Sequence, residues 1–352
     1  MGGTQCFKNK NREQIQVIKS NQVPQKKFSF GESQSEYPSK PKIVTSKAKK
    51  PTKVLQKYTV IKLCGVGFYS KVYLCSSSKS PNSFYAIKTL KKKKLNDPKS
   101  LSHISTELSF VENLSSPYIV NLVEKFEMDS RQYLVYPYYN LDIFNLIKLS
   151  KMRIPENIIK VILSQVYCGL SYLHSQHIIY RDLKPENIIV DTSSCFVKII
   201  DFGLSSKIEN DNIELHEICG TNEYIPPEVI NGSGYNYDFD YWTFGIFTYE
   251  LVFGYPPFKG SNQSEIFNDI QKKQIKVDET EERKVSNEMK DLLKYMLKKE
   301  REERMEWVNI PYHPFFKGID FFNKDKSNKS QEILKQFVEQ YKDYSPFVVD
   351  NY

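Results

Sequence analysis

The chain has 352 residues, a formal net charge of +8, and 40% hydrophobic and 14% aromatic residues. This is ample for a packed core and allows one large or two ordinary domains. The six cysteines form no Cys-x-x-Cys pair and no metal-ligand spacing with the five histidines, so we expect neither a disulfide scaffold nor a zinc site. No apolar run approaches the ~18–20 residues of a membrane span, and residues 1–57 show no apolar stretch of the kind found in secretory signals, so neither feature is expected.

Residues 1–57 form a basic arm. They contain 13 Lys and Arg against three Glu, a net charge of +10 that leaves −2 for the remaining residues. Their Lys, Ser, Gln and Pro content cannot offset the entropy of ordering, so we expect a mostly disordered segment. A solvated tail is the favoured interpretation. The alternative is contact with an acidic partner such as an anionic membrane; a nucleic-acid partner is not expected.

From Tyr58 onward the pattern predicts a small sheet with one helix, followed by a mainly helical region. The β-rich runs are 58–63, 71–75, 84–90 and 132–136, and the helical stretch is 101–113. Beyond Asn140 apolar residues recur at helical spacing around Ile158–Val166, with further helices expected at 241–253 and 287–297. The fold class is therefore α+β.

Near the end of the chain a helical apolar stripe is expected to dock on the chain's own core. Its members are Ile333, Leu334, Phe337, Val338 and Tyr341.

Five motifs stand in one order along the chain, and their order and spacing are more specific than any single motif. They are Gly65-Val66-Gly67-Phe68-Tyr69-Ser70, Ala86-Ile87-Lys88, the run from Tyr180 to Asn187, Asp201-Phe202-Gly203 and Pro226-Pro227-Glu228. Over about 58–316 the chain resembles the eukaryotic protein kinase family. The resemblance implies a bilobal fold with an N-lobe at about 58–136, a hinge at about 136–140 and a C-lobe at 141–316. It also implies ATP and Mg²⁺ as cofactors, and protein substrates.

An ATP site is implied in the N-lobe and hinge. Glycines in a hairpin let the backbone approach phosphates, and a lysine held by a carboxylate would bridge the α- and β-phosphates. The third glycine of the family pattern is here Ser70. Because proline has no N–H, the adenine bonds are expected on the Pro137 carbonyl and the Tyr138 amide. The implied ATP-binding residues are Leu63, Gly65, Gly67, Val72, Ala86, Lys88, Glu107 and Tyr138.

The catalytic groups are implied in the loop that follows Tyr180. Asp182 would orient the acceptor hydroxyl and take its proton, and Lys184 would stabilise negative charge on the transferring phosphoryl group. Asn187 and Asp201 would hold magnesium. Thr221 would contact Asp182 and Lys184 from the substrate side.

Three further residues are implied to be structural. Glu228 would pair with Arg304, although Pro226 departs from the family's usual alanine at the start of that motif. Asp240 would brace the catalytic loop.

The stretch from Cys219 to Tyr224 and the tyrosine before Arg181 resemble the AGC group, especially the catalytic subunits of cyclic-AMP- and cyclic-GMP-dependent kinases. A lysine at 184 is typical of serine/threonine kinases. The resemblance implies a preference for arginine upstream of the acceptor, read by Asp142, Glu186 and Glu250. It also implies that 317–352 is a short AGC-like C-terminal extension, and that any cyclic-nucleotide control comes from a separate regulatory subunit.

Glu217 stands where these relatives carry a phosphorylated threonine. That phosphate normally binds an arginine and a helix histidine, which correspond here to Arg181 and His103. We hypothesise that Glu217 supplies a permanent, weaker negative charge at this point, so that activity would not depend on phosphorylation of the activation loop.

The start Met1-Gly2-Gly3-Thr4-Gln5-Cys6 offers Gly2 for myristoylation and Cys6 for palmitoylation. A second acyl chain or the following basic residues would make membrane attachment stable. We expect a cytoplasmic protein with such an attachment as an option. Two other functions remain open: a pseudokinase scaffold that binds nucleotide without transfer, and a membrane-docked interaction protein whose arm is the main functional part.

Overall fold

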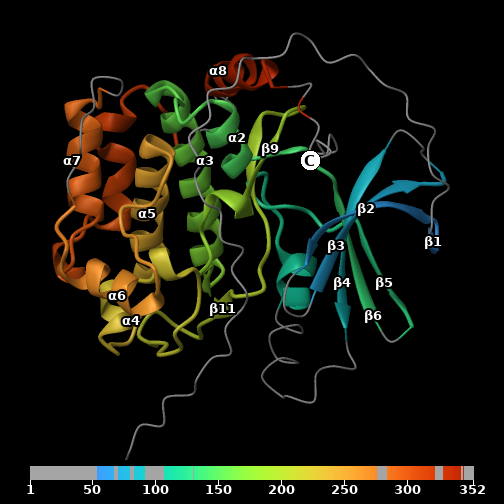
Figure 1. Cartoon of the computed structure of the whole chain (residues 1–352), viewed down its shortest axis with the longest axis horizontal. Coiled ribbons are helices and arrows are strands. Elements are labelled where there is room, and N and C mark those ends of the chain that lie inside the picture. Colours follow the sequence, from blue (N-terminus) through green and yellow to red (C-terminus); the bar gives the residue numbers. More distant parts are fainter. Residues whose placement is uncertain are drawn as a thin grey trace, which may run out of the picture. The chain divides into compact units, whose positions relative to one another are not determined.

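The computed structural model describes residues 54–66, 70–79, 83–91, 107–129, 131–275, 284–321, 328–341 and 344. All of them belong to one compact unit, Lys50–Tyr352. Within it, a twisted sheet lies on one side and a group of helices on the other (Figure 1), which confirms the α+β, two-lobed architecture predicted from the sequence. No helix among these described ranges is long and apolar enough to cross a membrane.

The smaller lobe is a six-stranded antiparallel sheet with the strand order β1-β2-β3-β4-β6-β5. Residues 107–113, which are helical, belong to the same lobe. The strands are β1 (Val54–Leu55), β2 (Tyr58–Val66), β3 (Ser70–Ser77), β4 (Phe84–Lys91), β5 (Glu124–Met128) and β6 (Arg131–Pro137).

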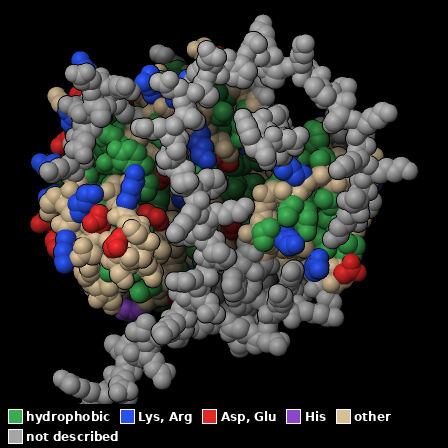
Figure 2. Space-filling model, in the orientation of Figure 1, with side chains coloured by type: hydrophobic (Ala, Val, Ile, Leu, Met, Phe, Trp, Pro, Cys, Tyr) green, Lys and Arg blue, Asp and Glu red, His purple; other side chains and the backbone are tan. Residues whose placement is uncertain are grey.

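Aromatic side chains fill one face of this sheet. Phe126 stacks between Tyr58 and Tyr133, with ring centroids 6.3 and 4.8 Å apart respectively. Tyr133 and Tyr58 are almost fully buried, and Cys75 and Ile87 complete the cluster. Period-two alternation of the strands places these residues on one face. On the face drawn in Figure 2, hydrophobic side chains also show between lysines and arginines over this sheet.

The larger lobe is mainly helical. Its helices are α2 (Ile143–Leu149), α3 (Glu156–Ser175), α4 (Pro227–Ile230), α5 (Asp238–Phe253), α6 (Gln263–Lys272), α7 (Asn287–Met296) and α8 (Asn328–Glu339). Its strands are β7 (Leu141–Asp142), β8 (Ile178–Ile179), β9 (Ile188–Asp191), β10 (Phe196–Ile199) and β11 (Ser206–Lys207), paired in the orders β10-β9-β7 and β11-β8. Short 3₁₀ turns occur at η2 (Pro185–Asn187), η3 (Asn222–Tyr224), η4 (Arg301–Glu303), η5 (Trp307–Tyr312) and η6 (Pro314–Phe316).

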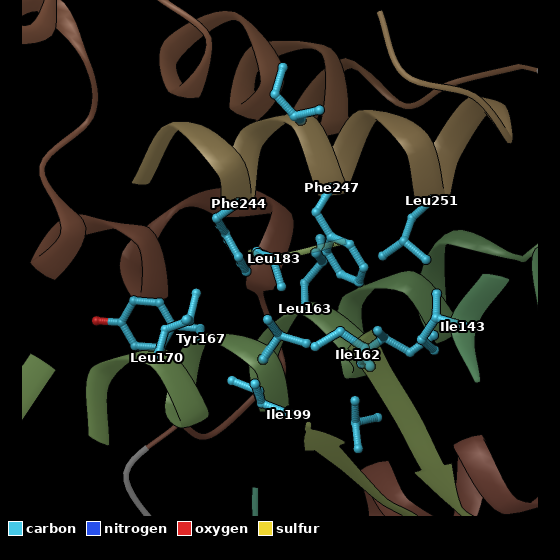
Figure 3. Packing of buried hydrophobic residues seen from close by; sticks show 14 of the residues in the cluster. Ile143, Ile162, Leu163, Tyr167, Leu170, Leu183, Ile199, Phe244, Phe247 and Leu251 are labelled. Atoms are coloured by element: carbon cyan, nitrogen blue, oxygen red, sulfur yellow. The ribbon is translucent and has the colours of Figure 1, made fainter. Parts of the chain in front are cut away.

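The core of this lobe lies between α3 and α5. Phe244, Phe247 and Leu251 point from α5 towards Leu163 and Tyr167 on α3 (Figure 3). Helix α5 is apolar on nearly every side and is buried accordingly. Because α5 is buried in this way, the residues at its start have fixed positions.

The C-terminal stripe docks on this core, as the sequence predicts. Leu334 and Val338 of α8 are 0% and 2% exposed, and both belong to the core cluster of the larger lobe. Ile333, Phe337 and Tyr341 pack against the same cluster.

Main-chain pairing joins the two lobes beside β10. Ile199 donates its amide to the Tyr118 carbonyl at 2.8 Å, and the Val120 amide donates to the Ile199 carbonyl at 3.0 Å. These bonds fix the strand that leads to Asp201 against the segment that leads into β5. The residues after β10 therefore face the small sheet.

Candidate active site

A buried lysine joins both lobes. Lys88 lies on β4, and its Nζ donates to Glu107 Oε1 at 2.5 Å and to Asp201 Oδ1 at 2.8 Å. Although burial lowers the pKa of Lys88, the carboxylates of Asp201 and Glu107 raise it more, so the lysine is held as a cation. Lys88 in turn lowers the pKa of Asp201 against the opposing effect of burial. The site thus has one fixed positive charge between two acids.

Gly203 is packed closely against this cluster. A Cβ at this position would lie 3.2 Å from Asp201 Oδ1 and 3.7 Å from Glu107 Oε2. The contact with Asp201 would be tight and would require a small shift of its carboxylate, whereas the contact with Glu107 would be an ordinary one. The glycine at the end of the Asp201-Phe202-Gly203 motif therefore has a local steric reason.

Next to Lys88 is a cavity of about 160 Å³ with mostly apolar walls. Val72 and Ala86 line it from the small sheet, and Ile189 lines it from β9. Val72 pairs with Lys88 across β3 and β4, so an apolar surface and the cation lie side by side. A flat apolar ring attached to phosphates would be complementary to this arrangement.

The structure contradicts one detail of the predicted adenine contact. Tyr138 lines the cavity, but its amide donates to the Phe84 carbonyl at 3.1 Å and is not free for a ligand. The reason is that pairing between β4 and β6 continues one residue past the end of β6. In an extended chain the Pro137 carbonyl and the Tyr139 amide then point to the opposite side. Tyr139 also lines the cavity.

The glycine-rich hairpin is described in part. Leu63 and Gly65 lie on β2, with an irregular register between them, and neither is among the residues that line the cavity. A Cβ at Gly65 would meet no atom within 4 Å. Gly67 lies outside the described residues.

The loop after β8 brings four polar groups together. Lys184 Nζ donates to both carboxylate oxygens of Asp182 at 2.9 Å and to Thr221 Oγ1 at 3.2 Å. Thr221 Oγ1 donates to Asp182 Oδ1 at 3.3 Å, and Asn187 Nδ2 donates to Asp182 Oδ2 at 2.7 Å. Burial raises the pKa of Asp182, while Lys184 and Asn187 act in the opposite direction. The carboxylate is therefore oriented from three sides.

Asp240 braces the main chain just before Asp182. Its fully buried carboxylate accepts from the Tyr180 amide at 2.8 Å, from the Arg181 amide at 2.9 Å and from His174 Nε2 at 2.8 Å. Arg181 has a φ of 66°, which is uncommon for a residue with a side chain. The bonds to Asp240 hold this strained conformation in place.

Asp201 and Asn187 fit a divalent cation of the magnesium type. Asn187 uses its amide nitrogen for Asp182, which leaves the amide oxygen as the atom able to ligate a metal. Asp201 is 47% exposed at its side chain. The described ranges contain no group of three or more His, Cys, Asp or Glu that could hold a metal. One carboxylate and one amide suit Mg²⁺, which takes its remaining oxygens from water and phosphates.

Glu228 and Arg304 form a buried, two-bonded ion pair. Arg304 Nη1 and Nη2 donate to the two carboxylate oxygens at 2.6 and 2.5 Å. Their side chains are 8% and 3% exposed. Glu228 lies in the first turn of α4, and Arg304 directly follows η4. The pair therefore links the segment after Thr221 to the segment at η4.

The three predicted substrate-reading acids do not share one environment. Asp142 is the N-cap of α2 and accepts from the Asn145 amide and from its side chain, both at 2.7 Å. Glu250 accepts from the Tyr224 hydroxyl at 2.5 Å. Burial and the negative charge of Glu186 raise the pKa of Glu250 to about 7, against the lowering effect of Tyr224. Glu186 and Glu250 therefore act on each other, whereas Asp142 has a local capping role.

Of the predicted activation-loop residues, the structure brings Arg181 and Glu217 together. Arg181 Nη1 lies 3.4 Å from Glu217 Oε2, and the Glu217 side chain is 49% exposed. His103, the third member, lies outside the described residues, as do Gly2 and Cys6.

Sequence reasoning missed the tyrosine hydroxyls that support this site. Tyr224 bonds Glu250, Tyr180 donates to the Ile200 carbonyl at 2.5 Å, and Tyr235 bonds Arg181. Tyr180 and Tyr224 lie within stretches that the sequence already singled out, and that position is the signal that could have identified them. Tyr235 lies seven residues after Glu228, and no pattern in the sequence marks it.

The sequence profile of the protein kinase domain matches residues 58–316. Protein kinase 2 and the cAMP-dependent protein kinase catalytic subunit of Dictyostelium discoideum are each 33% identical to the chain over 273 residues, which cover 76% of this chain and 55% and 41% of those proteins. Serine/threonine-protein kinase Sgk1 of Xenopus tropicalis is 30% identical over 321 residues, or 88% of this chain and 75% of that protein. The chain spans about half the length of the first two relatives.

Proposed function

The chain belongs to the protein kinase domain family, and we propose that it transfers the γ-phosphoryl group of ATP to serine or threonine hydroxyls of protein substrates. The relatives confirm the predicted resemblance to serine/threonine kinases, including cAMP-dependent ones. The observation that carries the proposal is the arrangement of Asp182, Lys184 and Asn187 opposite the Lys88–Asp201 ion pair.

In this proposal ATP lies between the lobes. The adenine occupies the apolar cavity beside Val72 and Ala86 and bonds to the Pro137 carbonyl and the Tyr139 amide, because the Tyr138 amide is already used. Lys88, kept positive by its two acids, binds the α- and β-phosphates. Asp201 and Asn187 would hold the magnesium ion, which would neutralise charge on the phosphates when bound.

The reaction then needs no covalent intermediate on the protein. The substrate hydroxyl oxygen forms a bond to the γ-phosphorus while the bond between that phosphorus and the bridging oxygen breaks, so ADP leaves with the electron pair. Asp182 accepts the hydroxyl proton, and Lys184 stabilises the negative charge on the phosphoryl oxygens. Thr221 donates to Asp182 and fixes the orientation of its carboxylate.

The pseudokinase alternative has little support. A chain that binds nucleotide without transfer has no need for a proton acceptor oriented by three neighbours, yet Asp182 is bonded to Lys184, Asn187 and Thr221. No observation on this chain favours that alternative.

Glu250 and Glu186 support a preference for basic substrates. Both belong to the large lobe, and their negative charges act on each other. A guanidinium placed between two carboxylates gains charge-assisted hydrogen bonds and relieves their mutual repulsion. We propose that these two acids read arginine upstream of the acceptor, with Asp142 contributing through α2.

The basic arm supports a second, separate proposal. Its net charge of +10 would attract an anionic membrane surface, with acylation at Gly2 and Cys6 strengthening the contact. Flotation with vesicles containing phosphatidylserine, with and without residues 1–57, tests this. A separate regulatory subunit is proposed from the likeness to a cAMP-dependent catalytic subunit alone.

The proposed activity is tested with a positional library of peptides in the presence of Mg-ATP. We expect phosphate on serine and threonine, not on tyrosine, and the highest rates with arginine upstream. Transfer to tyrosine, or indifference to arginine, would contradict the proposal.

A further inference from the structure

Tyr235 lies between α5 and the activation segment, residues 201–228, which run from the Asp201 motif to Glu228. Its ring is fully buried and packs on Phe239 with the centroids 5.0 Å apart. Its main chain pairs with Leu215 in an isolated antiparallel bridge, with N–H to O distances of 2.9 Å from Tyr235 and 2.8 Å from Leu215. The backbone of the segment is thus attached to a residue that cannot move away from the core.

The hydroxyl of Tyr235 makes two short bonds in addition. It donates to the main-chain carbonyl of Glu217 at 2.7 Å and accepts from Arg181 Nη1 at 3.0 Å. One buried neutral group therefore connects the activation segment to the residue immediately before Asp182. Both distances lie within the ordinary range for strong hydrogen bonds.

Arg181 is well placed to transmit this connection. Its side chain is 4% exposed, and Nε also donates to the Leu204 carbonyl at 2.6 Å. Its amide is bonded to Asp240. The guanidinium therefore ties together the segment after Phe202, the segment at Glu217 and the loop that carries Asp182.

The carboxylate of Glu217 makes a weaker contact with the same guanidinium. The atoms are 3.4 Å apart, and the glutamate is about half exposed, so water and salt reduce the attraction. The hydroxyl of Tyr235 is nearer and shielded from solvent. The geometry thus favours the neutral bond over the charged one as the main link at this position.

A second set of side-chain contacts holds the same segment. Arg301 Nη1 bonds to Glu214 Oε1 at 2.9 Å, and its Nε lies 2.6 Å from Asp238 Oδ2. The segment at 214–217 is therefore held by a side-chain ion pair, by main-chain bonds and by the Tyr235 hydroxyl.

We propose that Tyr235 is a positioning residue. Its hydroxyl holds the activation segment and Arg181 in the active arrangement, so that this kinase works without phosphorylation of its activation segment. The inference rests on the proposed kinase activity and concerns its regulation.

The test is the substitution Tyr235→Phe in the full chain, because it removes the hydroxyl and keeps the buried ring. The matched control is Tyr237→Phe, whose exposed hydroxyl bonds to Asp211 at 3.0 Å rather than to Arg181. Removing a buried bond to a charged group is expected to lower kcat roughly tenfold. The KM for ATP should change little, and Tyr237→Phe should match the wild type. The melting temperature of Tyr235→Phe should fall by a few degrees, because one buried hydrogen-bonding group is lost.

The wild type is also treated with phosphatase, checked by intact mass for the absence of phosphate, and assayed. We expect it to keep its activity. Hydrogen exchange of amides 213–219 should be faster in Tyr235→Phe than in Tyr237→Phe.

The outcomes separate the two proposals. If the wild type transfers no phosphate before or after treatment, the proposed function fails. If the wild type is active but loses its activity when phosphatase removes phosphate from it, the positioning role of Tyr235 is overturned. The same holds if Tyr235→Phe keeps the wild-type kcat. A loss of kcat accompanied by an equally large loss of ATP affinity and by a fall in the melting temperature of well over a few degrees would overturn it as well. The residue would then support only the global fold.

Discussion

Glu250 offers a pH test of substrate recognition. Burial raises its pKa to about 7 from an ordinary value of 4.5, a difference that corresponds to roughly 3 kcal/mol. At pH 8 the carboxylate is mostly charged, and at pH 6 only about a tenth of it is. Because a neutral carboxyl attracts a guanidinium far less than a carboxylate does, recognition of arginine should strengthen as the pH rises through about 7.

The assay is the ratio of kcat/KM for two peptides, one with arginine upstream of the acceptor and one with alanine there, measured from pH 6 to 8.5. Titration of Asp182 affects both peptides and cancels in the ratio. We expect the ratio to rise about tenfold between pH 6 and the plateau at high pH. In Glu250→Gln the ratio should be low and much less dependent on pH.

Tyr224 provides a second check on the same reasoning. Its hydroxyl donates to Glu250 and lowers the pKa of that carboxylate. In Tyr224→Phe the midpoint should therefore move to a higher pH. A ratio that stays constant from pH 6 to 8.5 in the wild type would refute the account of Glu250.

The same protonation has a consequence for folding. The native carboxyl of Glu250 holds its proton up to about pH 7, whereas the unfolded chain releases it near pH 4.5. The stability that this bound proton contributes to the native state is fully present below pH 4.5 and is lost as the pH rises through 7.

Three further substitutions probe the scaffold. Arg304→Met leaves the carboxylate of Glu228 buried without its partner, so the free energy of unfolding measured with urea should fall by about 3–5 kcal/mol; a loss below about 1 kcal/mol would contradict a structural role. Leu334→Ala should cost about 2–5 kcal/mol in the same measurement, since the side chain is fully buried, and an unchanged value would mean that α8 does not dock. Glu217→Ala should lower kcat only two- to threefold, roughly the value of an exposed ion pair, and a loss as large as that of Tyr235→Phe would show that the charge is the main link.

The sequence was informative wherever one residue type is required by the chemistry. The catalytic loop from Tyr180 to Asn187 and the Asp201 motif are close in the chain, and the resemblance to the kinase family implied that their side chains serve one site. Lys88 and Glu107 are 19 positions apart, and the family pattern was needed to pair them. The longer strands and helices, such as β4, α5 and α7, were predicted close to their observed bounds.

The sequence was less informative about groups that depend on register and tertiary packing. The Tyr138 amide is used because β4 and β6 pair one residue further than expected, and no local pattern encodes that register. The hydroxyl contacts of Tyr235 arise between segments far apart in the chain, whereas the capping contact of Asp142 is local and joins it to Asn145 three residues away. The short elements β7, β8, β11 and α6 were not predicted, since two-residue strands exist only through their partners and α6 has few apolar positions.

The central claim is tested most directly by comparing phosphate transfer from radiolabelled Mg-ATP to a serine peptide by the wild type and by Asp182→Asn. The account predicts transfer by the wild type, a loss of at least about 10³-fold in the variant, and equal binding of ATP to both proteins. A wild-type protein that binds ATP with no transfer, or an Asp182→Asn protein with the full rate, would contradict it.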